Sequence, residues 1–231
     1  MDAASQVLRE IAEGTGEARV PPGIPGIGPG GTAEPDAPLS PWSYEGLVGR
    51  LVEISAAAGS AALTAAMGLV LDAQGRGEPV AWVGPRASTF YPPDAQAGGV
   101  DLRALIVVRV PDAGTVARAA DRLLRSGAFG LVVMDLAGGA SERASPSNSL
   151  ETSALTRLLG LARRHEAALV LVTRKGEAAP SVGSLVSVRV EARRERIGPG
   201  HFRCAIRALK DKRRGPGWTW EECRRGPVGL R

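Results

Sequence analysis

Short apolar runs that alternate with segments of helical periodicity constrain the fold of this chain more than any other feature. The expected strands cover residues 50–55, 80–84, 105–110, 131–135 and 168–173, and the expected helices cover about 60–75, 114–126 and 151–165. Strands that are apolar at nearly every position are typical of a parallel sheet covered on both faces. The pattern predicts an α/β fold with a doubly wound, mostly parallel sheet and helices on both faces.

The pattern changes after residue 173. Segments 184–191 and 202–209 alternate apolar and polar residues, as half-exposed antiparallel strands do. The turn at 197–200, with the sequence IGPG, is expected to join them as a hairpin. Trp218 and Trp220 lie two positions apart, so both rings should point to one face and pack on the core as part of a final strand. The sheet is therefore expected to end in C-terminal antiparallel strands.

The first 41 residues differ in character from the rest. Residues 1–13 predict a short helix with an apolar stripe formed by Val7, Leu8 and Ile11. Half of the 28 positions from 14 to 41 are Gly or Pro, which predicts a flexible linker. A helix this short is marginal alone and must dock, either on its own domain or on a partner. Residues 42–231 then form the main domain.

Positive charge is concentrated at the C-terminal end. The whole chain has 29 Lys and Arg against 24 Asp and Glu, but residues 189–231 have 13 against 5. The candidate binding residues are Arg193, Arg194, Arg196, Lys210, Lys212, Arg213 and Arg214. Such a cluster can follow a phosphate backbone, with weak contact to single-stranded DNA as one outcome. A surface for an acidic partner and a merely solvated surface are the alternatives.

Several classes of protein are excluded. No apolar run reaches the length of a membrane-spanning helix, and the N-terminus lacks the pattern of a signal peptide, so a cytoplasmic protein without membrane contact is expected. Two cysteines, Cys204 and Cys223, and two histidines, His165 and His201, form no metal-ligand spacing and no catalytic arrangement. We expect no metal, no cofactor and no catalytic residue.

The loop after the first strand lies where a phosphate binds in doubly wound sheets. A working phosphate-binding loop there reads G-x-x-x-x-G-K-[ST], since Lys neutralises phosphate and the hydroxyl holds magnesium. At the corresponding positions this chain has Ala56 and Ala61 for the glycines, Ala62 for Lys and Leu63 for the hydroxyl residue. The loop is interpreted as an inactive nucleotide site; an ordinary strand–helix loop is the alternative.

Several segments, in consistent order over roughly residues 42–215, resemble the RecA family. GRLVEI at 49–54 is similar to the strand before the RecA phosphate loop, GVDLRALIVVRVPDAGT at 99–115 to the segment entering the third core strand, and LLRSGAFGLVVMD at 123–135 to the approach to the Walker B aspartate. SVRVEARRERIG at 187–198 and KDK at 210–212 resemble the closing antiparallel strands. The resemblance implies a RecA-like core.

Departures from that family all weaken ATP chemistry. Arg86 lies at or beside the position of the catalytic glutamate, and Thr173, Arg174 and Lys175 follow the fifth strand in place of the γ-phosphate-sensing glutamine. Asp135 occupies the Walker B position with no magnesium to hold, which leaves it a solvated or capping role. The segments at 138–149 and 176–183 are similar to shortened DNA-binding loops. A degenerate RecA-like domain, a pseudo-ATPase, is expected.

A RecA-like core without these groups resembles the ImuA family, some members of which are described as SulA-like. That resemblance implies a non-catalytic accessory role in translesion synthesis, the SOS mutagenesis response to DNA damage. The implied partners are RecA, an ImuB-type Y-family-like protein and an error-prone replicative-type polymerase. In this hypothesis the Val7, Leu8 and Ile11 stripe docks on RecA and limits its filament. The alternatives are a SulA-like inhibitor of cell division and a DNA-binding recombination accessory with residual nucleotide binding.

Overall fold

The computed structural model describes residues 40–55, 60–88, 90–137 and 150–226. The predicted N-terminal helix with Val7, Leu8 and Ile11, nearly all of the predicted linker, Ala56 and the shortened loop at 138–149 lie outside the described residues. The described residues carry an eight-stranded sheet and most of the candidate site residues.

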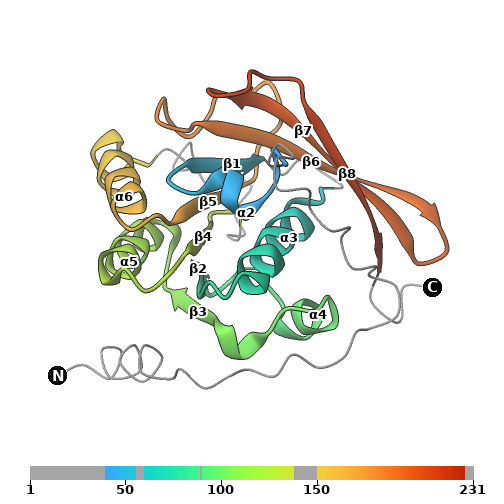
Figure 1. Cartoon of the computed structure of the whole chain (residues 1–231), viewed down its shortest axis with the longest axis horizontal. Coiled ribbons are helices and arrows are strands. Elements are labelled where there is room, and N and C mark those ends of the chain that lie inside the picture. Colours follow the sequence, from blue (N-terminus) through green and yellow to red (C-terminus); the bar gives the residue numbers. More distant parts are fainter. Residues whose placement is uncertain (1–39, 56–59, 89, 138–149, 227–231) are drawn as a thin grey trace. The chain divides into compact units, whose positions relative to one another are not determined.

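The described strands form one eight-stranded sheet of order β3-β2-β4-β5-β1-β6-β7-β8 (Figure 1). The parallel strands are β1 (Leu51–Ser55), β2 (Val80–Pro85), β3 (Leu105–Val110), β4 (Leu131–Asp135) and β5 (Ala168–Thr173). Each lies within one residue of its predicted range. The α/β class and the mostly parallel sheet are thus confirmed.

Three long helices cover this part of the sheet: α3 (Ala62–Gly75), α5 (Ala113–Ser126) and α6 (Thr152–Arg164). Asp112 caps α5 by accepting a hydrogen bond from the Thr115 amide at 2.9 Å, and Gly127 ends it in the left-handed region at φ 67°. The sequence did not predict α2 (Tyr44–Leu47), α4 (Pro92–Ala97) and the single 3₁₀ turn at Leu102–Ala104, because elements this short have no clear periodicity.

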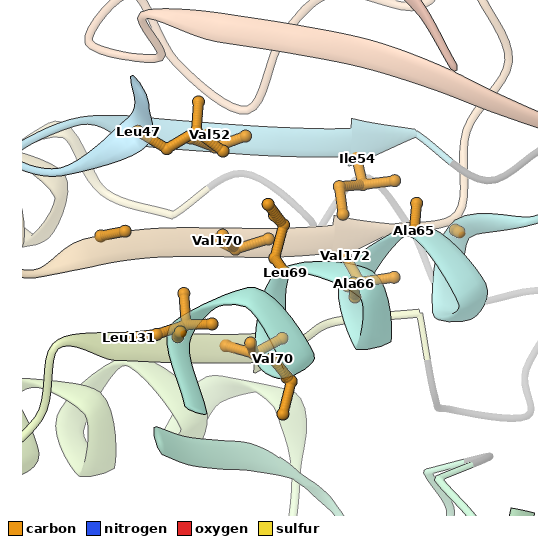
Figure 2. Packing of buried hydrophobic residues seen from close by; sticks show 14 of the residues in the cluster. Leu47, Val52, Ile54, Ala65, Ala66, Leu69, Val70, Leu131, Val170 and Val172 are labelled. Carbon is orange, nitrogen blue, oxygen red and sulfur yellow. The ribbon is translucent and has the colours of Figure 1, made fainter. Parts of the chain in front are cut away.

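The helices lie on both faces of the sheet, as predicted. On one face α3 presents small and branched side chains to the strands, and Figure 2 shows Leu47, Val52, Ile54, Ala65, Ala66, Leu69, Val70, Leu131, Val170 and Val172 in one buried cluster. α5 and α6 pack on the opposite face against β2, β3, β4 and β5. Fully burying a Leu or Val side chain stabilises a fold by about 1.5–3 kcal/mol, so this double cover explains the apolar runs.

The C-terminal strands are β6 (Val188–Gly198), β7 (His201–Asp211) and β8 (Thr219–Arg225). β6 and β7 form the predicted antiparallel hairpin through Pro199 and Gly200, and β8 pairs antiparallel with β7. Trp218 and Trp220 both pack against the core cluster, which confirms the predicted final strand.

The prediction for 184–191 was wrong in two respects. The strand begins at Val188, and its first half pairs parallel with β1 as well as antiparallel with β7. Val188 to Ala192 are consequently buried on both faces instead of half exposed. The alternation was misleading because Arg189 and Glu191, its polar members, are themselves buried.

Candidate functional site

The first region of interest is the start of α3, where the inactive nucleotide site was predicted. The Ala61 amide donates to the carbonyl of Ala192 on β6 at 3.2 Å, and the Ala62 amide donates to Ser60 Oγ at 2.9 Å. Ser60 Oγ in turn donates to the same Ala192 carbonyl at 3.2 Å. Two amides at this helix start, which a phosphate would need, are therefore occupied by the protein itself.

The side chains at the helix start are as unsuited to phosphate as the amides. Ala61 and Ala62 are buried, and Leu63 packs partly buried against the core. None of the three carries a polar group. At this end the loop is packed as ordinary structure, and Ser60 forms an isolated antiparallel bridge with Arg193 of β6.

A buried carboxylate on β1 binds Lys175, one of the two cations that follow β5. Glu53, in the middle of β1, is fully buried, and its Oε1 forms an ion pair with Lys175 Nζ at 2.7 Å. Its Oε1 also accepts from Thr173 Oγ1, and its Oε2 accepts from the Val182 amide, both at 3.0 Å. Lys175 is therefore engaged by the fold, with its side chain only 15% exposed.

Arg189 fixes the same loop from β6. Its Nε donates to Ser55 Oγ at 2.8 Å, its Nη2 donates to the Gly176 carbonyl at 2.9 Å, and its Nη1 donates to the Ala179 carbonyl. Glu53 and Arg189 thus hold the segment that resembles a shortened DNA-binding loop. Lys175 and Arg189 therefore both serve internal structure.

Asp135, predicted to occupy the Walker B position with a solvated or capping role, is buried, so the solvated alternative does not apply. It accepts hydrogen bonds from Ser88 Oγ and, at 3.0 Å, from the Ala137 amide, which agrees with the predicted capping role. Gly84 permits the close approach, because a Cβ there would lie 3.2 Å from both Asp135 Cβ and Ser88 Cβ. Arg86 lies at the end of β2 and points to solvent.

The first part of the basic end lies on β6, near the hairpin turn. Arg193 forms an ion pair with Glu191 at 3.0 Å, and Arg194 stacks over the Phe202 ring at 5.1 Å. Arg196 Nε donates to the Gly198 carbonyl at 3.3 Å. The outer face of the hairpin carries further acid–base pairs, among them Arg207 with Glu177 at 2.6 Å and Arg203 with Glu195 at 3.3 Å. This surface is of mixed charge.

The second part of the basic end follows β7 and surrounds a buried acid. Asp211 binds Arg50 Nη2 at 2.5 Å and accepts from Trp218 Nε1 at 3.1 Å. Lys212 Nζ donates a hydrogen bond to the Ser184 carbonyl at 2.7 Å. The pKa of Lys210 is lowered, first by burial and then by the positive charge of the neighbouring Lys212. Arg213 and Arg214 are exposed, and both of their amides donate to Asp211.

The two basic groups are far apart. Arg196 pairs with Phe202 at one end of β7, and Lys210 lies eight residues further along that strand. At roughly 3.3 Å per strand residue this separation is about 26 Å. The seven candidate residues are therefore not gathered in one compact cluster.

The remaining candidates carry structure. Within the described ranges no three His, Cys, Asp or Glu side chains come together as a metal site. His165 caps the C-terminus of α6, and His201 begins β7 with Nδ1 2.8 Å from the Pro199 carbonyl. Cys204 is buried and Cys223 is exposed, both as the sequence indicates.

Sequence reasoning missed Glu53 and Arg189, the residues that organise this edge of the sheet. A signal was present, because a charge inside an otherwise apolar strand requires a buried partner. Glu53 bonds to Thr173 and Val182, and Arg189 bonds to Ser55. Each of these partners lies 120 or more residues away in the sequence, so spacing along the chain could not identify them.

Comparisons with protein families and with curated proteins give no match to this chain. In the part of the chain that the structure describes, no helix has the length and apolar character needed to cross a membrane.

Proposed function

We propose that this protein is a non-catalytic RecA-like accessory factor of SOS-induced mutagenic translesion synthesis, acting through protein contacts. The observation that carries the non-catalytic part is the start of α3. Its first amides are bonded to β6 and Ser60, and buried alanines lie where the phosphate-binding Lys should be.

The internal contacts of two cations near the end of β1 support the same proposal. Lys175 is bound by Glu53, and Arg189 is bound by two loop carbonyls and Ser55. A triphosphate at the end of β1 would have to displace these contacts and leave the buried Glu53 carboxylate without its cation, which is strongly unfavourable.

The RecA-like assignment rests on the segment resemblance and is supported by the sheet. The segment similar to the strand before the phosphate loop becomes β1, inside the sheet. Those similar to the closing strands become β6, which pairs parallel with β1, and β7, which pairs antiparallel with β6. The partners, RecA and an ImuB-type protein, follow from the resemblance to the ImuA family.

Isothermal titration of the full chain with Mg-ATP and Mg-ADP tests the non-catalytic part. We expect no heat of binding and no shift in melting temperature at millimolar nucleotide, because ligand binding to the folded state must raise stability. An Ala62→Lys variant should also fail to bind, since the amides at the helix start remain engaged. Saturable binding by the natural protein would refute the pseudo-ATPase and favour the recombination accessory.

Pull-down of RecA tests the partner. Leu8→Asp with Ile11→Asp should abolish the interaction, because charges would replace the apolar stripe of the predicted N-terminal helix. Gln6→Asp with Arg9→Gln changes the net charge equally on the opposite side of that helix and should leave binding unchanged. The proposed contact would be contradicted if the two variants captured RecA equally. It would also be contradicted if the natural chain captured no RecA.

A further inference from the structure

The edge of β8 that faces away from β7 is paired with no other described strand, and it supports an inference independent of the proposed function. β8 is the last strand of the described sheet, paired on one side with β7. Its seven residues read Thr-Trp-Glu-Glu-Cys-Arg-Arg, so two acids and two bases lie symmetrically about Cys223. An exposed edge strand is a template for pairing with another chain.

The backbone of β8 shows which groups face outward. The Trp218 carbonyl accepts from the Ala208 amide, and the Gly226 amide donates to the Gly200 carbonyl, both toward β7. The β7–β8 register has no irregularity, so hydrogen-bonding direction alternates strictly from residue to residue. The amides and carbonyls of Glu221, Cys223 and Arg225 consequently point away from β7, to the open edge.

We propose that β8 pairs antiparallel with β8 of a second copy of this chain, with Cys223 opposite Cys223 at the twofold axis. This register places Glu221 opposite Arg225 on the exposed face and Glu222 opposite Arg224 on the inner face. It also brings together the outward backbone groups of residues 221, 223 and 225 in both strands.

Charge selects this register over its neighbours. A shift by one pair in one direction places Glu222 opposite Glu222, and a shift in the other direction places Arg224 opposite Arg224. Directly opposed like charges destabilise a strand pair, and opposed unlike charges stabilise it. Among these registers, only the one centred on Cys223 places each of the four charged residues across from a residue of opposite charge.

Unsatisfied atoms on β8 agree with the pairing. Arg224 Nη2 lies 2.5 Å from Glu222 Oε2 within one chain, while Glu222 Oε1 and Arg224 Nε have no hydrogen-bond partner among the described residues. These are one acceptor and one donor on the two inner-face positions that the twofold axis brings opposite each other. Both atoms are buried within one chain, so the Glu222 and Arg224 side chains must both reorient to bond across the twofold axis.

Sedimentation velocity of the full chain over a concentration series tests the dimer. A single strand pair is a small interface, so we expect reversible, concentration-dependent association. Glu221→Arg and Arg225→Glu, each alone, should weaken the dimer at least about tenfold, because both symmetry-related pairs become repulsive. Mixing the two variants, or combining both changes in one chain, should restore association. Both residues are exposed, so folding is preserved and circular dichroism checks it.

Thiol crosslinking tests the register. A short bifunctional thiol reagent should join two natural chains through Cys223, and Cys223→Ser should prevent this crosslink. Cys204→Ser is the control, because Cys204 is buried and its replacement should leave the crosslink unchanged. A monomer at all concentrations, or a dimer indifferent to the charge reversals, would overturn the proposal. A β8 edge covered instead by the chain's own N-terminal residues would give the monomer result.

Discussion

The most enclosed ion pair among the described residues is the one between Arg50 and Asp211. Their side chains are 4% and 0% exposed, and the carboxylate also receives Trp218 Nε1 and the amides of Arg213 and Arg214. Burial alone would raise the pKa of Asp211, but the hydrogen bonds from Arg213, Arg50 and Trp218 outweigh it and lower that pKa.

Asp211→Asn should therefore destabilise the fold by about 3 kcal/mol at pH 7, because Arg50 would stay buried without its counter-charge. Because the pKa of Asp211 is lower in the folded state, its ionised carboxylate stabilises the fold at pH values above the unfolded-state pKa of about 4. This stabilisation is lost as the pH falls toward the folded-state pKa. The difference between natural and variant proteins should be constant from pH 8 to about 5 and shrink below pH 4. Urea unfolding at several pH values measures it.

The matched control is Glu195→Gln, since Glu195 pairs with Arg203 in solvent, at 68% and 46% exposure. Exposed pairs contribute at most about 1 kcal/mol. Equal losses for the two variants would show that Asp211 does not act through its buried partners.

The ends of the helices decide much of the architecture at the scale of elements. Gly127 ends α5 at φ 67°, and a Cβ there would lie 2.8 Å from His165 Nδ1 at the end of α6. Gly160 is a contrasting glycine, exposed inside α6 with nothing within 4 Å of its Cβ position. One glycine is required by its turn, and the other is only tolerated.

Alanine at these two glycines should have opposite effects. Gly127→Ala should cost about 1 kcal/mol or more, because a left-handed residue with a Cβ is strained and His165 must move. Gly160→Ala should stabilise by roughly 0.5–1 kcal/mol, since alanine is the better helix former. Thermal unfolding of both variants measures the pair; a loss at Gly160 would show a packing role that the open surroundings do not indicate.

The same contrast explains which elements the sequence could predict. The five apolar strands and three long helices were predictable within two residues, because their burial is a repeating property of the chain. The start of β6 was not, since Arg189 and Glu191 imitate a solvent-facing alternation while being buried. Glu53 was visible as an anomaly, but its three partners are defined only by the folded sheet.

Burial in the sheet falls from its centre to its edges. β1, β4 and β5 have buried side chains at every position, whereas β8 alternates between exposed and intermediate positions. Strands that are covered on both faces open only when the whole domain unfolds, and edge strands open locally. The β8 edge proposed as a dimer surface accordingly lies outside the most buried part of the sheet.

Hydrogen exchange of the full chain should follow this gradient. Amides of β4, β5 and β1 should exchange at the rate of global unfolding. In dilute protein the amides of Glu221, Cys223 and Arg225 on β8 should exchange much faster, because they face an edge with which no described strand pairs. Raising the protein concentration should protect these three amides and leave the central strands unchanged, as β8 pairing requires. In Arg225→Glu the concentration dependence should disappear while the central protection persists. Protection of the three amides that is already complete in dilute protein would mean that another segment of the same chain occupies the edge.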